Sequence, residues 1–166
     1  MNIAIVGATG NVGRKTLEVL VKKDLPIDNL YLVASSKSVG KKINFKGVDH
    51  EIYDLESFDF SRVKICFFAA GGKISEKFAE KAAKNCLVID NSSYFRMDPD
   101  VPLIVPQVNS EDLKTIKKNI VANPNCSTAQ LVIVLKPLHD LFSIKRIVVS
   151  TYQSVSGGGK APMDEL

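Results

Sequence analysis

Residues 2–13 read NIAIVGATGNVG, and this stretch decides the fold. A short β-branched strand runs into a turn with the spacing GxxGxxG, and a helical pattern follows at once. The first glycine lets the chain turn sharply, the second lets the backbone approach a pyrophosphate, and the third lets the helix pack closely on the strand. Free N–H groups at the helix N-terminus then face the phosphates. The pattern predicts a dinucleotide-binding turn, and a merely structural tight turn is the alternative. The candidate cofactor-binding residues here are Gly7, Thr9, Gly10, Asn11, Val12 and Gly13.

Strand and helix patterns alternate after this turn. The expected strands are 30–34, 43–45, 48–53, 63–70, 87–90, 120–122 and 144–154, with Gly47 as the turn of a hairpin. Four helices are expected: one that begins at residue 11, one over 75–85, one that begins at residue 110 and one over 127–135. Pro137 either kinks the last helix or starts a new piece. On the first helix, Val12, Thr16, Val19 and Leu20 form the expected apolar stripe. A long loop is expected over 91–108.

This alternation predicts an α/β fold, a Rossmann-like doubly wound and mostly parallel sheet over residues 1–123. Residues 124–166 are interpreted as the start of a second α/β domain with catalytic and dimerisation roles. The strand expected over 144–154 has no partner strand after it in the sequence, so it closes no core. We therefore expect the chain to be the N-terminal part of a longer polypeptide.

The segment after the second strand bears on the choice of cofactor. An NAD site requires an acidic residue about 20 residues after the glycines, to hold the ribose 2′-hydroxyl. This sequence instead has Ser35, Ser36, Lys37 and Ser38. Hydroxyl groups and an ammonium group suit a 2′-phosphate, which favours NADP over NAD. A serine-rich surface loop is the alternative interpretation.

Three cysteines are present, and their settings differ. Cys66 and Cys86 lie in apolar strand contexts and are expected to be small buried residues. An odd count without an export signal argues against a disulfide framework. Cys126, in NPNCST, follows a strand and precedes a helix, where the helix dipole and free N–H groups favour the thiolate. A thiolate attacks carbonyl carbon, and the same N–H groups can hold the resulting oxyanion, so Cys126 is the candidate nucleophile. A small buried residue is the alternative.

The composition excludes several classes of protein. The chain has 166 residues, 45% hydrophobic and 24% charged, which is typical of a globular protein and not of a disordered one. The longest aliphatic run, 131–135, is too short for a membrane helix, and the N-terminus has no basic targeting segment. The net charge of +4 is spread over isolated lysine pairs, so nucleic-acid binding is not expected. We predict a cytoplasmic protein with no metal site.

The motifs together resemble the aspartate-semialdehyde dehydrogenase family. The matching segments are GATGNVG, ASSKSVGK, FFAAGG, DNSSYFRMDPDVPLIVPQVN, NPNCST and TYQSVSGGGKAPMDEL, in the order of the family. The resemblance implies NADP-dependent reductive dephosphorylation of β-aspartyl phosphate to aspartate β-semialdehyde, in the biosynthesis of lysine, methionine, threonine and diaminopimelate. It also implies a homodimer for the full-length protein. The alternatives are N-acetylglutamyl-phosphate reductase, which runs the same chemistry on a different acyl phosphate, and a non-catalytic NADP-binding module.

The resemblance also implies roles for individual residues. Cys126 forms the acyl-enzyme, and Arg96 holds the substrate phosphate or inorganic phosphate. Asn125 and Gln153 contact the substrate, and Ser156-Gly157 contact the cofactor. Two features depart from the family pattern. Lys37 stands where the family usually has arginine, and neither of the two histidines, His50 and His139, matches the family's general base.

Overall fold

The computed structural model describes residues 1–165, and a seven-stranded sheet lies at its centre. The strands are β1 (Asn2–Val6), β2 (Asn29–Ala34), β3 (Lys42–Phe45), β4 (Val48–Asp54), β5 (Ile65–Phe68), β6 (Leu87–Asp90) and β7 (Ile120–Ala122). The α-helices are α1 (Asn11–Lys23), α2 (Gly72–Ala83), α3 (Pro106–Asn109), α4 (Cys126–Phe142) and α5 (Lys160–Asp164). Short 3₁₀ turns are η1 (Ser36–Ser38), η2 (Phe60–Arg62), η3 (Ser110–Thr115) and η4 (Val155–Gly158).

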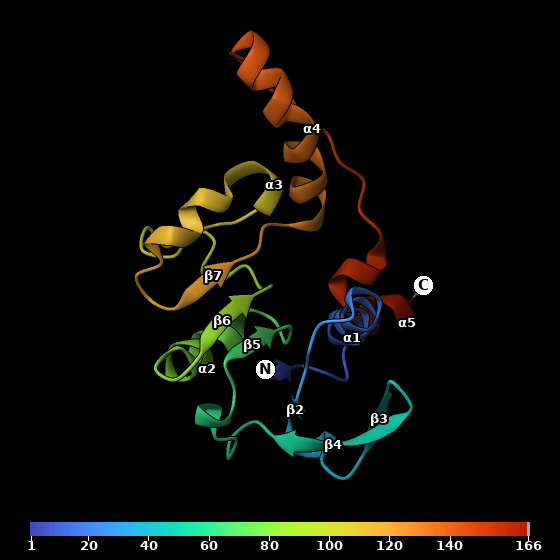
Figure 1. Cartoon of the computed structure of the whole chain (residues 1–166). Helices are drawn as coiled ribbons and strands as arrows, with labels where there is room; N and C mark the ends of the chain where they lie inside the picture. Colours follow the sequence, from blue (N-terminus) through green and yellow to red (C-terminus); the bar gives the residue numbers. More distant parts are fainter. Residues whose placement is uncertain (166) are drawn as a thin grey trace.

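The strand order is β3-β4-β2-β1-β5-β6-β7, and every neighbouring pair is parallel except β3 with β4 (Figure 1). This confirms the predicted doubly wound, mostly parallel sheet. The chain leaves β1 for β2 on one side and returns to β5 on the other. The strand order therefore reverses between β1 and β5, and ligands of such sheets bind outside the carboxyl ends of the strands at that point.

The two faces of the sheet bury separate apolar clusters, because successive strand side chains point to opposite faces. Ile3, Ile5 and Leu32 pack with Leu17 and Leu20 of α1 on one face. The other face packs against α2. Its cluster contains Ala4, Val6, Cys66, Phe68, Phe78, Cys86 and Ile120. Burial raises the pKa of the Cys66 thiol well above its ordinary value, so this side chain stays protonated. The prediction of buried Cys66 and Cys86 is confirmed.

Of the apolar stripe predicted for α1, Leu20 is confirmed as buried, but Val12 and Val19 are wrong. Gly13, Leu17 and Leu20 are the buried residues of this helix, whereas Val12 and Val19 are each 45% exposed. Positions 13, 17 and 20 follow the helical repeat around the one face that meets the sheet. Close packing at Gly13 selects this face, because only a residue without a side chain fits there.

The region after β6 is more broken than predicted. The predicted loop over 91–108 already turns helical at Pro106, where α3 begins with proline in its first turn. No α-helix starts at residue 110, and the 3₁₀ turn η3 forms there instead. Asn109 is part of the reason. Its Oδ1 accepts a hydrogen bond from the Val105 N–H (2.9 Å), and its Nδ2 donates to the Leu103 carbonyl (3.0 Å). The side chain therefore binds the backbone of the preceding loop and does not cap a helix at residue 110.

The part of the chain after β7 also differs from the prediction. α4 continues beyond residue 135, through Pro137, to Phe142. The strand expected over 144–154 does not form, because within residues 1–165 no neighbouring strand offers it hydrogen bonds. This stretch instead runs back beside α4 and ends at η4 and α5, next to α1 (Figure 1).

Candidate active site

The turn between β1 and α1 contains three glycines with different surroundings. Gly7 has φ +85°, and its N–H donates to the Val33 carbonyl (2.8 Å). A Cβ at Gly7 would lie 2.7 Å from the Ala69 oxygen, and one at Gly13 would overlap the Gly7 oxygen. A Cβ at Gly10 would meet only the Gly7 oxygen, at 3.4 Å. Packing therefore explains Gly7 and Gly13, whereas at Gly10 a side chain would meet a single backbone atom.

The N-terminus of α1 suits an anion. Its N-cap is Gly10, no side chain caps the first turn, and that turn holds no acidic residue. The first N–H groups of the helix thus lack side-chain partners, and the dipole presents its positive end there. Thr9 stays in the turn, where its carbonyl accepts from Arg14 Nε (3.2 Å). Together with the space over Gly10, this geometry fits the pyrophosphate of a dinucleotide.

The loop after β2 lies beside this turn. Val33 pairs with Val6, so the end of β2 is one strand away from Gly7. Ser35 is followed by η1, which carries Ser36, Lys37 and Ser38 at the surface. Hydroxyl and ammonium groups are therefore available where the ribose of a bound dinucleotide would lie.

Cys126 is the first residue of α4, directly beyond the carboxyl end of β7. Its side chain is exposed, which excludes the alternative of a small buried residue. Asn125 is the N-cap: its Oδ1 accepts from the Ser127 N–H (3.0 Å) and the Ser127 hydroxyl (2.8 Å). The Cys126 thiol also points at this oxygen, with Sγ 3.7 Å from Oδ1. A nucleophile at a helix N-terminus has backbone N–H groups near it that can stabilise an oxyanion.

Of two residues from distant segments, Gln153 contacts this helix start and Arg96 is anchored shortly before it. Gln153 Nε2 donates to Asn125 Oδ1 (3.3 Å) and to the Ser127 hydroxyl (3.4 Å). Arg96 is half-buried; its Nε donates to the Asn123 carbonyl (2.9 Å) and its Nη2 to the Asn91 carbonyl (3.3 Å). The guanidinium is thus anchored at the ends of β6 and β7, three residues before Cys126. Folding brings together the predicted nucleophile and the three predicted substrate residues.

Sequence reasoning missed Asp90, the last residue of β6, as part of this region. Asp90 is fully buried. One carboxylate oxygen accepts from the Ser75 hydroxyl (2.7 Å) and the Ser92 N–H (3.1 Å), and the other accepts from the Ser92 hydroxyl (2.7 Å). These bonds tie α2 to the start of the loop that carries Arg96. The only signal in the sequence is an acidic residue closing an apolar strand.

The cofactor turn and Cys126 lie on the same edge of the sheet. β7 is three strands from β1, a separation of about 14 Å at the usual strand spacing. The segment with η4 returns to this edge, where Asn11 Nδ2 lies 3.3 Å from Met163 Sδ. Ser156 and Gly157 are exposed in η4. The two histidines lie elsewhere: His50 packs edge-on against Phe45, and His139 is four turns along α4.

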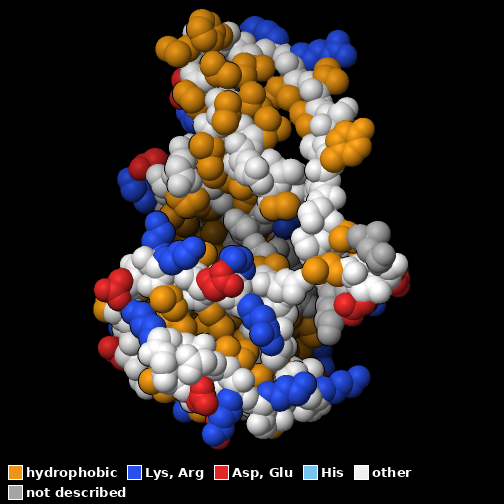
Figure 2. Space-filling view, turned by 90° about the vertical axis from the view of Figure 1, so that its right-hand side faces the viewer, with side chains coloured by type: hydrophobic (Ala, Val, Ile, Leu, Met, Phe, Trp, Pro, Cys, Tyr) orange, Lys and Arg blue, Asp and Glu red, His pale blue; other side chains and the backbone are white. Residues whose placement is uncertain are grey.

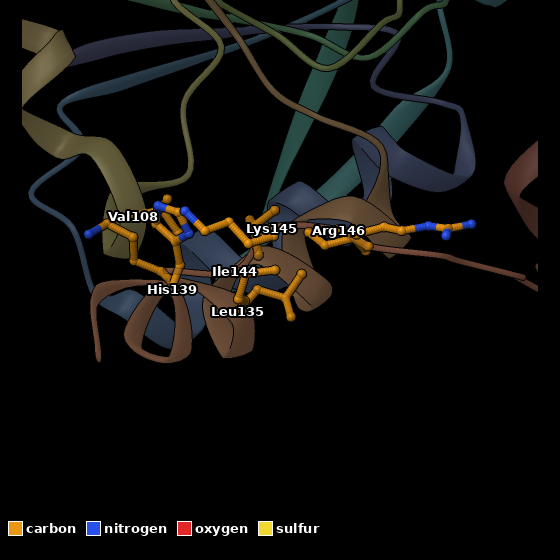
Figure 3. Close-up of a pocket in the computed structure, with 9 residues that line it drawn as sticks. Val108, Leu135, His139, Ile144, Lys145 and Arg146 are labelled. Carbon is orange, nitrogen blue, oxygen red and sulfur yellow. The ribbon is translucent and has the colours of Figure 1, made fainter. Parts of the chain in front are cut away.

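A separate cavity of about 380 Å³ lies between α3, α4 and residues 144–147, and neither Cys126 nor the glycine turn lines it (Figure 3). Val108, Leu135 and Ile144 form part of its apolar lining, with His139 and Lys145 beside them. Figure 2 shows hydrophobic side chains gathered over this end of the molecule. Among the residues described, no helix has the length and apolar character needed to cross a membrane.

Comparison with known proteins finds matches along nearly the whole chain. A family model described as "Semialdehyde dehydrogenase, NAD binding domain" matches residues 2–116, and one described as "Semialdehyde dehydrogenase, dimerisation domain" matches residues 135–166. The chain is 54% identical over 167 residues to aspartate-semialdehyde dehydrogenase of Rickettsia bellii, with 99% of this chain and 49% of that protein covered.

Solved structures show the same similarity. Aspartate semialdehyde dehydrogenase II from Vibrio cholerae, complexed with ASA, has a TM-score of 0.95 at 51% identity, over 99% of this chain and 49% of that one. The Candida albicans enzyme with NADP has a TM-score of 0.69 at 29% identity, over 86% and 48%. The chain spans about half the length of the curated relatives it matches. Because the first family model covers most of the sequence, the chain belongs to the semialdehyde dehydrogenase family and contains its nicotinamide-dinucleotide-binding domain.

Proposed function

We propose that this chain carries the cofactor site and the acyl-forming residues of an NADP-dependent aspartate-semialdehyde dehydrogenase. The reaction is the reductive dephosphorylation of β-aspartyl phosphate to aspartate β-semialdehyde. The observation that carries this proposal is the exposed Cys126 at the start of α4, with Gln153 beside its N-cap and Arg96 anchored just before it. The relatives named for this reaction support the choice of substrate.

The acyl-transfer step follows from the position of Cys126. Its thiolate attacks the acyl carbon of β-aspartyl phosphate, forming a C–S bond, and the carbonyl electrons move onto oxygen. N–H groups at the start of α4 stabilise this oxyanion. The C–O bond to phosphate then breaks, and inorganic phosphate leaves with the electron pair. The product is a thioester on Cys126.

The neighbouring residues bind and orient the substrate in this proposal. Arg96 has a planar guanidinium suited to phosphate, and its two bonds to backbone carbonyls fix its direction. Gln153 and Asn125 are held against each other and supply amide groups beside the sulfur. Oriented groups of this kind place the acyl carbon within reach of the nucleophile.

NADP is the proposed cofactor, with its pyrophosphate over Gly10 and its 2′-phosphate at Ser35–Ser38. When bound and reduced, it supplies the hydride that converts the thioester to the aldehyde. Thr9, Asn11 and Val12 would line the pyrophosphate site, and Ser156-Gly157 in η4 would contact the bound cofactor. Lys37 offers a point charge instead of the planar fork of arginine, so we expect a looser grip on the 2′-phosphate.

The division into domains and the need for a further residue also belong to this proposal. Residues 1–123 form the NADP-binding domain, and residues 124–166 begin the catalytic and dimerisation domain of a homodimer. Proton transfer requires a base near the sulfur, but His139 is 13 residues along α4 from Cys126, about 20 Å at the helical rise. We therefore propose that these 166 residues alone turn over poorly.

Acyl transfer can be tested without turnover. The purified chain is mixed with β-aspartyl phosphate in the absence of reductant, and released phosphate and the mass of the Cys126 peptide are measured. We expect one equivalent of phosphate and an aspartyl adduct on Cys126. Cys126→Ser should abolish the thioester while retaining NADP affinity, and Thr128→Ala, in the same exposed helical turn, should leave both unchanged.

Two results would contradict the proposal. Acylation by N-acetylglutamyl phosphate in preference to β-aspartyl phosphate would assign the chain to the related reductase. NADP binding without acylation by either compound would indicate a non-catalytic binding module.

A further inference from the structure

Asn91 and Asn123 directly follow two neighbouring strands, at the carboxyl ends of both. β6 ends at Asp90 and β7 at Ala122, and these two residues are paired. The Asn123 N–H donates to the Asp90 carbonyl (2.8 Å), which continues the ladder by one residue. The next residue, Pro124, has no N–H, so it cannot donate a further ladder bond. Asn91 and Asn123 therefore stand where the two strands can separate.

The side chains of these two asparagines join the strand ends. Asn123 Nδ2 donates a hydrogen bond to Asn91 Oδ1, and both residues are partly buried. The backbone N–H of Asn91 donates to the Phe68 carbonyl at the end of β5 (2.9 Å). Asn91 is thus fixed by its backbone to β5 and by its side chain to the residue after β7.

The backbone carbonyls of the same two asparagines hold the guanidinium of Arg96. Its Nε donates to the Asn123 carbonyl (2.9 Å) and its Nη2 to the Asn91 carbonyl (3.3 Å). Because both acceptors are neutral, they orient the guanidinium without neutralising its charge. The N–H groups of Nη1 have no partner within residues 1–165. These groups are therefore available to a phosphate.

We propose that Asn91 is a positioning residue for acyl transfer, and that its bond to Asn123 directs the Arg96 guanidinium at the leaving phosphate. This inference rests on the proposed function. The two carbonyls that hold Arg96 come from separate loops, so the angle of the guanidinium depends on what joins those loops. Beyond the last ladder bond, the amide–amide bond joins them.

The direction of the guanidinium matters for the step in which the C–O bond to phosphate breaks. Negative charge develops on the leaving phosphate, and a donor that already points there stabilises it. A small misplacement of such a group slows the reaction strongly. Loss of the Asn91 side chain should therefore slow acylation by a phosphate-bearing donor in particular.

The test compares two acyl donors on one protein. The purified chain is treated with β-aspartyl phosphate and, in parallel, with the β-(p-nitrophenyl) ester of aspartate, and the second-order rate constant for acylation of Cys126 is measured by mass spectrometry. In both reactions a C–S bond forms and a C–O bond breaks; phosphate leaves from the first donor and nitrophenolate from the second. Asn91→Leu should lower the ratio of the phosphate rate constant to the ester rate constant about tenfold.

Asn85→Leu provides the matched control. Asn85 is exposed just before β6, at the opposite end of this strand, and the same chemical change there should leave the ratio as it was. A loss of folded protein lowers both rate constants together and cancels in the ratio. Arg96→Ala should lower the ratio by itself. Adding Asn91→Leu to Arg96→Ala should lower it no further, because Asn91 acts through the guanidinium.

Three results would overturn the inference. An unchanged ratio in Asn91→Leu would overturn the positioning role alone, since acylation of the original chain by β-aspartyl phosphate would still support the proposed function. A further drop in the Arg96→Ala background would show that Asn91 acts independently of Arg96. Acylation of the original chain by neither donor would overturn the proposed function, and this inference with it.

Discussion

The three glycines of the turn have different causes: two are explained by packing within the protein and one by the proposed ligand. Gly7 and Gly13 cannot carry a side chain, because a Cβ at either position would meet backbone atoms of the turn or of the segment after β5. Gly10 has an ordinary φ of −78°, and a Cβ there would meet only the Gly7 oxygen, at 3.4 Å. Nothing in the protein requires glycine there. The requirement comes from the backbone approach of the proposed pyrophosphate.

This difference predicts opposite results for two alanine variants. Gly13→Ala should lower the free energy of unfolding by about 2–3 kcal/mol, because the new methyl group overlaps the Gly7 carbonyl. Gly10→Ala should cost less than about 1 kcal/mol, as an N-cap exchange, yet weaken NADP binding at least tenfold. Urea unfolding and calorimetric titration measure the two quantities. Equal losses of stability would show that Gly10 is also a packing glycine.

Ser75 offers a second prediction for a single residue. Ser75→Ala removes a hydroxyl that donates to the buried Asp90 carboxylate (2.7 Å), and should cost about 1–3 kcal/mol in unfolding free energy. Ser93→Ala is the matched control, since that side chain is exposed and directly follows the paired Ser92. We expect the control to change stability by less than about 0.5 kcal/mol. A neutral Ser75→Ala would show that Asp90 finds another donor.

At the scale of elements, the sequence predicted what local pattern determines. β6 and β7 form over the predicted residues, and the hairpin turns at Gly47, because apolar runs and turn glycines act locally. The turn from β1 into α1 also forms where it was predicted, because its glycines act locally. The features that the sequence did not predict depend on contacts with distant segments. They are the buried face of α1, the 3₁₀ form of η3, and the absence of a strand over 144–154.

The candidate site shows the same limit. The positions of Cys126 and Asn125 follow from a strand–helix junction that the sequence already displays. The contact of Gln153 with Asn125 joins residues 28 apart, and no local pattern encodes it. The buried Asp90 likewise depends on the hydroxyl of Ser75, 15 residues away in α2, which no local pattern places beside it. These contacts require the folded chain.

An ion pair between Asp98 and Lys118 holds the loop between β6 and β7, and it stabilises the fold over a defined pH range. A hydrogen bond from Lys118 (2.9 Å) and one from the Asp100 N–H lower the pKa of Asp98, and the same pair raises the pKa of Lys118. A lowered carboxyl pKa stabilises the fold above the unfolded value, about 3.9, and this stabilisation is lost as pH falls through the folded value. A raised lysine pKa contributes fully below about 10.4 and is lost at higher pH.

Asp98→Asn should therefore lower the Tm more at pH 7 than at pH 2, because the original carboxyl takes up a proton as the pH falls through its lowered pKa. The Tm difference between the two proteins should also shrink near 1 M salt, because the Debye length falls to about 3 Å and the pair is at the surface. Thermal unfolding followed by circular dichroism at both pH values gives the comparison. A difference that persists at pH 2 would assign the effect to packing instead of charge.

At the scale of the whole molecule, one sheet edge organises the proposed chemistry. The loops after β1 and β2 hold the cofactor in our proposal, and those after β6 and β7 hold Arg96 and Cys126. The strand order therefore places cofactor binding and acyl transfer at different positions along this edge. The opposite end of α4 takes no part in this arrangement and leaves a large apolar surface exposed (Figure 2).

This apolar surface predicts self-association of the 166-residue chain. Leu141 and Phe142 are each 74% exposed and Val148 is 78% exposed, next to the cavity of Figure 3. Contiguous apolar surface of this kind drives association in water. The region lies within the match to the family's dimerisation domain, residues 135–166. Sedimentation velocity at tens of micromolar protein should therefore show species larger than a monomer.

The double variant Leu141→Glu/Phe142→Glu should shift this distribution to the monomer, while NADP affinity and the circular dichroism spectrum stay unchanged, because both side chains are far from the cofactor edge. Val48→Glu makes the same chemical change at an isolated apolar residue of the β3–β4 hairpin, 60% exposed, and should leave association as it was. A monomeric original chain, or equal effects of the two substitutions, would show that α4 does not drive the association.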